Sequence, residues 1–146
     1  LQDWSKRLED GIRHYSGTAI YRKSFDMPVS EVRGRKSEVR KLYLHIGSVK
    51  NLAQVRLNGR DLGVVWCAPW RVEITGAVKA GANQLEITVA NLWPNRLIGD
   101  QSLPPEQRLT STTWNPYQKD SQLLESGLLG PVTIQSVAGA QATAPR

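Results

Sequence analysis

The chain has 146 residues, of which 40% are hydrophobic and 22% charged, so it is long enough for one globular domain with a core. No apolar run approaches the roughly 20 residues of a membrane helix, and the single cysteine, Cys67, excludes an internal disulfide. The net charge of +6 includes an early basic stretch, Arg33 to Lys41, typical of a solvated loop or, alternatively, of a surface for nucleic acid or another acidic polymer.

The first segment, Leu1–His14, is the only stretch with a helical pattern. Trp4, Leu8 and Ile12 recur every four residues and predict one apolar stripe. We expect a short helix or an irregular lead-in that packs beside a sheet, with Trp4 in the core. Because the sequence begins with leucine rather than methionine, we also expect a mature or excised piece of a longer protein.

From residue 18 onward, the hydrophobic period changes to two, which is typical of strands with one buried face. The dipeptide Asn58-Gly59 is the strongest hairpin signal in the chain, because both residues tolerate the positive φ of a type I′ turn. Short strands separated by turns predict an antiparallel β-sandwich, an all-β fold. The predicted strands are Thr18–Phe25, Lys41–Ile46, Ala53–Leu57, Asp61–Trp66, Arg71–Ile74, Gln84–Ala90 and Pro131–Val137.

The stretch from Asn91 to Leu129 does not fit this scheme. It begins with Asn-Leu-Trp-Pro-Asn-Arg-Leu-Ile-Gly-Asp, in which Pro94 cannot continue a strand because it has no amide hydrogen. We expect an irregular segment of nearly forty residues, too long for a passive connection. Either it covers an edge of the core, or it forms a polar and aromatic binding surface.

Catalytic and metal sites are poorly supported by the sequence. Glu73 and Glu86 each lie between inward apolar residues, so they are expected to point to solvent rather than to form an acid–base pair. There is no G-x-S-x-G motif, and one cysteine with two separated histidines does not suit zinc. Calcium remains possible, with oxygen ligands from Asn95, Asp100 and Asp120.

The abundance of large rings and amides favours carbohydrate instead. Sugars stack their C–H faces on aromatic rings, while amide and charged groups bind the hydroxyls. Trp66 is expected in the core, and the polar members of the site either bind hydroxyls or fix the loop. The predicted sugar-binding residues are Trp70, Asn91, Trp93, Asn95, Arg96, Asp100, Trp114 and Tyr117.

Several stretches resemble a known family. The sequences HYSGTAIYRKSF, LHIGSVKNLAQVRLNGRDLGVVWCAPWRVEIT, GANQLEITVANLWPNRLIGD and LLESGLLGPVTI are similar to the sugar-binding β-sandwich of glycoside hydrolase family 2 and its relatives. They resemble above all the C-terminal domain of bacterial family 106 α-L-rhamnosidase-like enzymes. The resemblance implies a galactose-binding-like jelly roll, in an enzyme whose catalytic carboxylates lie on a separate barrel domain.

We therefore expect a non-catalytic module, secreted or periplasmic, of a bacterial glycoside hydrolase that acts on plant or other complex glycans. It would bind carbohydrate or adjoin the active site, with the catalytic domain as its partner. Alternatively, it is a structural packing domain that binds no sugar. We expect no nucleic-acid or membrane partner. One domain is expected over residues 1–137, followed by a disordered tail, 138–146.

Overall fold

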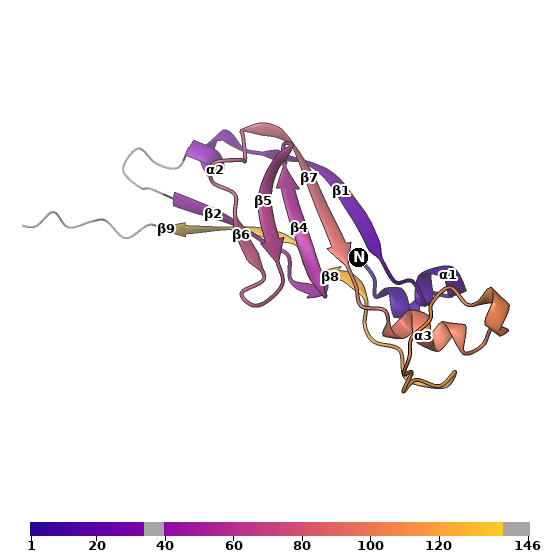
Figure 1. Ribbon diagram of the computed structural model, residues 1–146. Helices are drawn as coiled ribbons and strands as arrows, with labels where there is room; N and C mark the ends of the chain where they lie inside the picture. The colour runs from indigo at the N-terminus through magenta and orange to yellow at the C-terminus, as the bar shows by residue number, and fades with distance from the viewer. Residues whose placement is uncertain (34–39, 139–146) are drawn as a thin grey trace, which may run out of the picture.

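The computed structural model describes residues 1–33 and 40–138. Two antiparallel sheets lie face to face, and a short two-stranded ladder closes one end (Figure 1). The first sheet, in spatial order, comprises β1 (Thr18–Met27), β7 (Gly81–Ala90), β4 (Leu52–Leu57) and β5 (Arg60–Val65). The second comprises β6 (Arg71–Glu73), β2 (Arg40–His45) and β9 (Thr133–Ala138), and the ladder comprises β3 (Ser48–Lys50) and β8 (Gly127–Gly130).

The predicted hairpin is confirmed. Asn58 and Gly59 have φ values of 53° and 80° and join β4 to β5, which pair antiparallel. The longest ladder joins β1 to β7, with Thr18 opposite Ala90 and Met27 opposite Gly81. Two strands far apart in the sequence therefore pair in the first sheet, and the start of β1 lies beside the end of β7, so the lead-in and the segment that follows Ala90 meet at the same end of the sheet.

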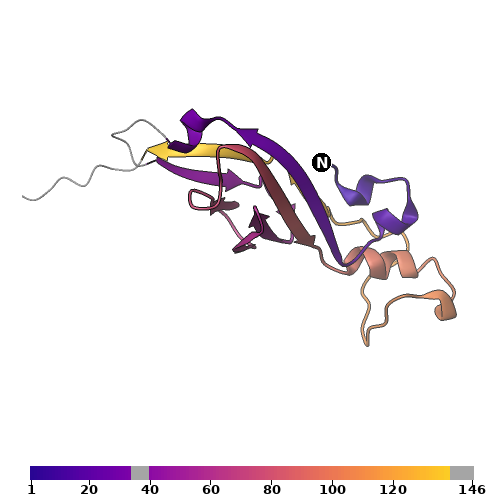
Figure 2. The same ribbon diagram turned by 90° about the horizontal axis from the view of Figure 1, so that it is seen from above.

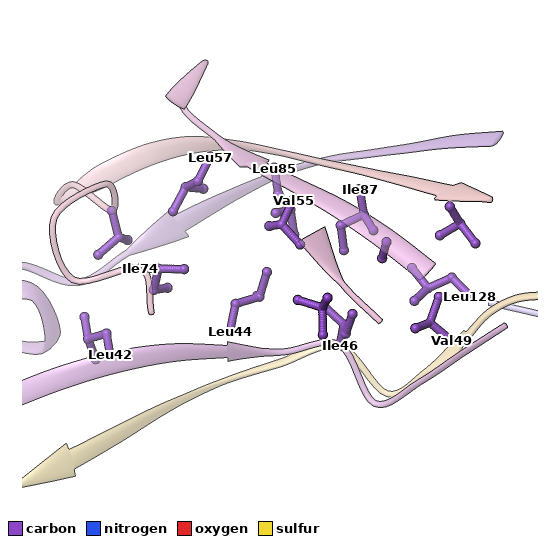
Figure 3. Close-up of a cluster of buried hydrophobic side chains, with 14 of the residues drawn as sticks. Leu42, Leu44, Ile46, Val49, Val55, Leu57, Ile74, Leu85, Ile87 and Leu128 are labelled. Atoms are coloured by element: carbon purple, nitrogen blue, oxygen red, sulfur yellow. The ribbon is translucent and has the colours of Figure 1, made fainter. Parts of the chain in front are cut away.

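The core fills the space between the sheets with aliphatic side chains (Figure 3). As the alternation predicts, one face of each central strand is buried, and the partly buried Val132 and Ile134 pack against this core. Burial of such side chains contributes roughly 1.5–3 kcal/mol each. The inward residues of the three central strands are Leu42, Leu44, Ile46, Ala53, Val55, Leu57, Leu85, Ile87 and Val89.

Two expectations for the hydrophobic residues are wrong. The apolar stripe of the lead-in does not form, because a 3-10 turn, η1 (Trp4–Lys6), and a short helix, α1 (Asp10–Arg13), replace one continuous helix. Trp4 is buried, but the Leu8 side chain is 92% exposed. Trp66 is also outside the core: it follows the last residue of β5 and is 70% exposed.

The structure also contains helical segments beyond the lead-in. They are α2 (Val29–Arg33), α3 (Pro94–Asp100) and the 3-10 turn η2 (Pro105–Gln107). The expectation that the segment after Asn91 is irregular is therefore wrong at Pro94. The proline that cannot continue a strand is the first residue of a helix, where its fixed φ is favourable and its missing amide costs no hydrogen bond.

Two predictions fall on residues outside the described part of the chain. The basic stretch from Arg33 to Lys41 lies largely there, and so does the predicted tail, apart from Ala138, which ends β9. Of the helices within residues 1–33 and 40–138, none combines the length and the apolar character required to cross a bilayer.

Candidate functional site

Seven of the eight predicted site residues lie in the segment 91–126, which contains α3. In space, α3 and α1 are neighbours beyond the end of the sandwich (Figure 2). We call residues 1–17 and 91–126 the α3 region. Its polar side chains connect the two parts of this region, and the eighth predicted residue, Trp70, lies outside it. Trp70 is half-buried against the sandwich core, and its carbonyl accepts a hydrogen bond from the Ile46 amide.

Asn91 joins the end of β7 to the lead-in. Its Oδ1 accepts a hydrogen bond from the Gly17 amide at 2.9 Å, and its Nδ2 donates to the Tyr15 carbonyl at 2.7 Å. These partners are 74 and 76 residues away in sequence. The side chain therefore fixes where the chain enters β1 and where it leaves β7.

Asn95 holds the returning chain against α3. Its Oδ1 accepts from the Leu124 amide at 2.8 Å, while its Nδ2 donates to the Leu124 carbonyl at 2.7 Å and to Ser126 Oγ at 3.1 Å. The residue is 1% exposed, and these bonds engage both its oxygen and its nitrogen. The side-chain amide of Asn95 thus pairs with the backbone of Leu124 as a neighbouring strand would.

Arg96 and Asp100 form a buried ion pair on α3, as their spacing suggests. The Arg96 Nη2 and Asp100 Oδ1 atoms are 2.8 Å apart, and the carboxylate is 1% exposed. Asp100 Oδ2 accepts from the Thr110 amide at 2.9 Å and from its hydroxyl. Burial opposes ionisation, but the hydrogen bonds from Thr110 and the Leu109 backbone, with the Arg96 charge, lower the pKa of Asp100 below its ordinary value.

The lead-in has its own buried carboxylate. Asp3 Oδ1 accepts from the Ser126 amide at 3.0 Å and caps η1 through the Ser5 amide. Burial opposes ionisation of Asp3, yet the hydrogen bonds from Ser126 and Ser5 and the Lys6 charge lower its pKa. Trp4 Nε1 donates to Tyr21 Oη at 2.7 Å, which anchors the lead-in to β1.

These contacts favour one of the two roles that the sequence leaves open for Asn91, Asn95, Arg96 and Asp100. Apart from Arg96 Nε, which is buried without a hydrogen-bond partner, their polar atoms contact groups of the same chain, so the structure supports the loop-fixing role. Sugar contact by these residues stays a prediction. The spacing of Arg96 and Asp100 indicates their pair, but the partners of Asn91 and Asn95 lie 29 to 76 residues away, and sequence patterns do not reveal such long-range pairing.

The surface of the α3 region is rich in apolar side chains. Trp93, just before α3, is 58% exposed, and Trp114 is 75% exposed, as expected for this segment. Tyr117 is half-buried, and its amide donates to Asn115 Oδ1 at 3.0 Å. Within residues 91–126, the exposed large apolar side chains are Leu92, Trp93, Leu109, Trp114 and Leu124.

Two of the cavities beside α3 are lined by residues of the segment 91–126. The first, of about 450 Å³, lies between the turn that joins β3 to β4, the start of α3 and the returning residues 122–126. The ion pair between Lys50 and Glu125, with 3.1 Å between Nζ and Oε2, lies on its wall beside Gln122 and Leu92. Sequence reasoning missed Lys50, Gln122 and Glu125, because residues of this kind are common on any protein surface.

The second cavity, of about 490 Å³, lies on the other side of α3 and is lined by Gln101, Arg108, Thr110, Thr112 and Asn115, among others. The aromatic side chains predicted to stack on sugar line neither cavity. In the described part of the chain, no three histidine, cysteine, aspartate or glutamate residues are grouped as a metal site would require.

The two carboxylates considered for catalysis are each paired with a basic side chain. Glu73, on β6, accepts a hydrogen bond from Lys41 Nζ at 3.1 Å. Glu86, on β7, accepts from Arg22 Nε at 2.9 Å. The two strands belong to different sheets, and each carboxylate is paired with a cation on a neighbouring strand of its own sheet. This arrangement does not resemble two carboxylates that face each other across a bound sugar.

Comparison with known proteins gives a consistent family. Residues 7–122 match the model of a family described as glycosyl hydrolase 2 galactose-binding domain-like. A curated relative, a putative beta-glucuronidase from Formosa agariphila, is 40% identical over 157 residues, which cover 92% of this chain and 13% of the relative. The predicted family resemblance is thereby confirmed.

Solved structures agree with this result. A rhamnosidase from Novosphingobium sp. PP1Y is 42% identical, with a TM-score of 0.82, over 94% of this chain and 12% of its own. A beta-D-glucuronidase from Dictyoglomus thermophilum, with a TM-score of 0.58 and 23% identity over 91% of this chain and 23% of its own, shares the fold. The predicted galactose-binding-like sandwich is confirmed, and the chain spans about an eighth of the length of the first relatives it matches.

Proposed function

The chain belongs to the glycosyl hydrolase 2 galactose-binding domain-like family, and from this premise we propose that it is a non-catalytic accessory module of a longer bacterial glycoside hydrolase. In the rhamnosidase and the putative beta-glucuronidase, most of the chain lies outside the matched part. We assign catalysis to that remainder, and we expect the enzyme to be secreted or periplasmic and to act on complex glycans. Whether the module lies at the C-terminal end of its enzyme stays a prediction.

The proposal rests on a difference between the buried and the exposed side chains of the α3 region. Asn95, Asp100 and Ser126 are buried and bonded to groups of the same chain, whereas Trp93, Trp114 and three leucines are exposed to solvent. Neighbouring exposed apolar side chains are costly for a free surface and typical of an interface. We therefore assign the surface around Trp93 and Trp114 to contact with the catalytic part of the enzyme.

The test is a pair of substitutions, Trp93→Ser with Trp114→Ser, in the full-length enzyme. We expect the module to detach, so that limited proteolysis releases it at least several-fold faster, because such rings often dominate interface energies. Trp66→Ser is the matched control, since Trp66 is similarly exposed but lies outside the α3 region. Equal release rates for the double variant and the wild type would contradict docking through this surface.

A second candidate function is sugar binding, and the 450 Å³ cavity favours it. Lys50, Gln122 and Glu125 provide donors and acceptors beside the apolar Leu92, the combination that a sugar with polar edges and C–H faces requires. Trp93, Trp114, Tyr117 and Trp70 do not line this cavity, so stacking by these four residues stays a separate prediction from the sequence. Calcium, if it binds, would need oxygen ligands other than the paired Asp100.

Calorimetry on the isolated chain tests this second function. Oligosaccharides that contain rhamnose or glucuronic acid are titrated to millimolar concentration. Binding that is weakened about tenfold by Gln122→Ala would support the cavity, since the loss of one good hydrogen bond costs about 1.4 kcal/mol. Flat titrations with every sugar would exclude binding by this module alone and leave the docking role.

A further inference from the structure

An apolar groove opens between the two sheets on the side where β1 and β9 are the outermost strands. Its volume is about 520 Å³, and its floor is the sandwich core itself. Half-buried side chains of β1 and β9 form its walls. Their apolar surface is in contact with water, and another chain segment lying in the groove would bury it. The apolar lining includes Tyr21, Phe25, Leu44, Ile87, Leu128 and Ile134.

Both strands beside the groove have a free edge. Among the strands within residues 1–33 and 40–138, β1 pairs only with β7, and β9 pairs only with β2. The two edges differ in charge. β1 carries the exposed Arg22, Lys23 and Asp26, and charges on an edge strand discourage further pairing.

The strand β9 lacks such protection. Its sequence, Thr-Ile-Gln-Ser-Val-Ala, contains no charged residue and no proline. Unprotected edges of this kind accept another strand readily, because a row of backbone donors and acceptors is unpaired. Of the two edges beside the groove, β9 is thus the one suited to further pairing.

A charged side chain at the rim of the groove indicates what kind of chain segment would fill it. Lys23 follows the inward alternation of β1, between Tyr21 and Phe25, but it is exposed and lines the groove. A strand that fills the groove would present alternate apolar side chains to the core. It would also gain a charge-assisted contact from a carboxylate where it passes Lys23.

We propose that an extended segment from elsewhere in the longer enzyme pairs with β9 and buries its apolar side chains in this groove, as an added outer strand of the second sheet. This proposal rests on the proposed function, because the segment comes from the remainder of that enzyme. The rhamnosidase and the putative beta-glucuronidase have 88% and 87% of their chains outside the matched part, from the 12% and 13% covered. Backbone pairing supplies affinity, and the alternate side chains supply specificity.

Thiol labelling compares the isolated chain with the full-length enzyme, with Cys67→Ser as the background. Three reporters are introduced one at a time: Ile134→Cys in the groove, Gln135→Cys on the opposite face of β9, and Leu124→Cys on the α3 region. Maleimide labelling of each reporter is followed by peptide mass spectrometry. We expect the Ile134→Cys thiol to react about tenfold or more slowly in the full-length enzyme, because labelling then requires local opening.

The reporters separate this proposal from the proposed function. Slow labelling at position 134 but not at 135 in the full-length enzyme supports strand addition, whatever happens at position 124. Equal labelling of position 134 in both proteins overturns it, and slow labelling at 124 alone would leave docking intact. Slowing at position 134 in the isolated chain that grows with protein concentration would identify a second copy as the occupant and would also overturn it.

Discussion

The sandwich and the α3 region are held together in different ways. In the sandwich, aliphatic side chains such as Ile46 and Val55 are fully buried between the sheets, where they pack in one cluster with other apolar side chains. In the α3 region, the buried groups include Asn95, Asp100 and Ser126, each hydrogen-bonded to specific partners. Hydrophobic burial is non-directional, whereas a buried hydrogen bond depends on one geometry.

The difference has a functional consequence. A surface built on specific polar contacts holds a fixed shape even though its outer side chains are apolar. The rings of Trp93 and Trp114 can therefore stay exposed without collapse of the segment that carries them. Such preorganised apolar surfaces bind partners at a lower entropic cost. The following experiments test this comparison, in order of decreasing expected effect.

The largest effect is expected in the sandwich. Ile46→Ala removes a fully buried side chain just after the end of β2 and should lower the free energy of unfolding by about 4 kcal/mol. Ile20→Ala, at a half-exposed position of β1, should cost less than about 1 kcal/mol. Urea denaturation measures both, and similar losses would mean that the core is not where stability concentrates.

The ion pair of α3 comes next. Asp100→Ala leaves the Arg96 guanidinium buried without its carboxylate, so we expect a loss of about 3 kcal/mol. Asp61→Ala, at a solvent-exposed carboxylate, should lower the free energy of unfolding by much less. Equal small losses in denaturation would show that the polar contacts of the α3 region are not structural.

Asn95 tests a single polar contact. Asn95→Ala leaves the Leu124 amide and carbonyl without partners, which should cost about 2 kcal/mol. We also expect faster hydrogen exchange at residues 122–126, while the β4–β7 ladder stays protected. Gln122→Ala, an exposed position on the same segment, is the control. Faster exchange throughout the sandwich would instead mean that the two regions unfold together.

Acid should weaken the α3 region more than the sandwich. Asp3 and Asp100 have pKa values lowered in the folded state, so their stabilisation is complete above the unfolded-state value, near 3.8. It is lost as the pH falls through the folded-state values, at up to about 1.4 kcal/mol per pH unit for each group. Urea unfolding between pH 5 and about pH 2 measures this slope. In Asp100→Asn the slope should be shallower, and an unchanged slope would refute the assignment.

Much of the sandwich follows from the sequence. The alternation of Leu85, Ile87 and Val89 and the Asn58-Gly59 turn depend on neighbours in the chain, so local patterns identify them. Family resemblance then supplies the topology.

The α3 region is less accessible to such reasoning. Pro94 signals the end of a strand, and it equally suits the first turn of a helix, which the sequence analysis did not consider. Asn91 pairs with a residue 76 positions earlier, and Asn95 with one 29 positions later, so no periodicity marks their partners. Exposure of Trp66 was missed because a ring after a strand pattern can lie on either side of it.

The central claim is that the surface around Trp93 and Trp114 is covered by the rest of the enzyme. Hydroxyl-radical footprinting with mass spectrometry tests it directly, by comparing oxidation rates of the tryptophans in the isolated chain and in the full-length enzyme. The account predicts that oxidation of Trp93 and Trp114 slows about fivefold or more in the full-length enzyme, while buried Trp4 stays slow in both. Unchanged rates at Trp93 and Trp114 would contradict it.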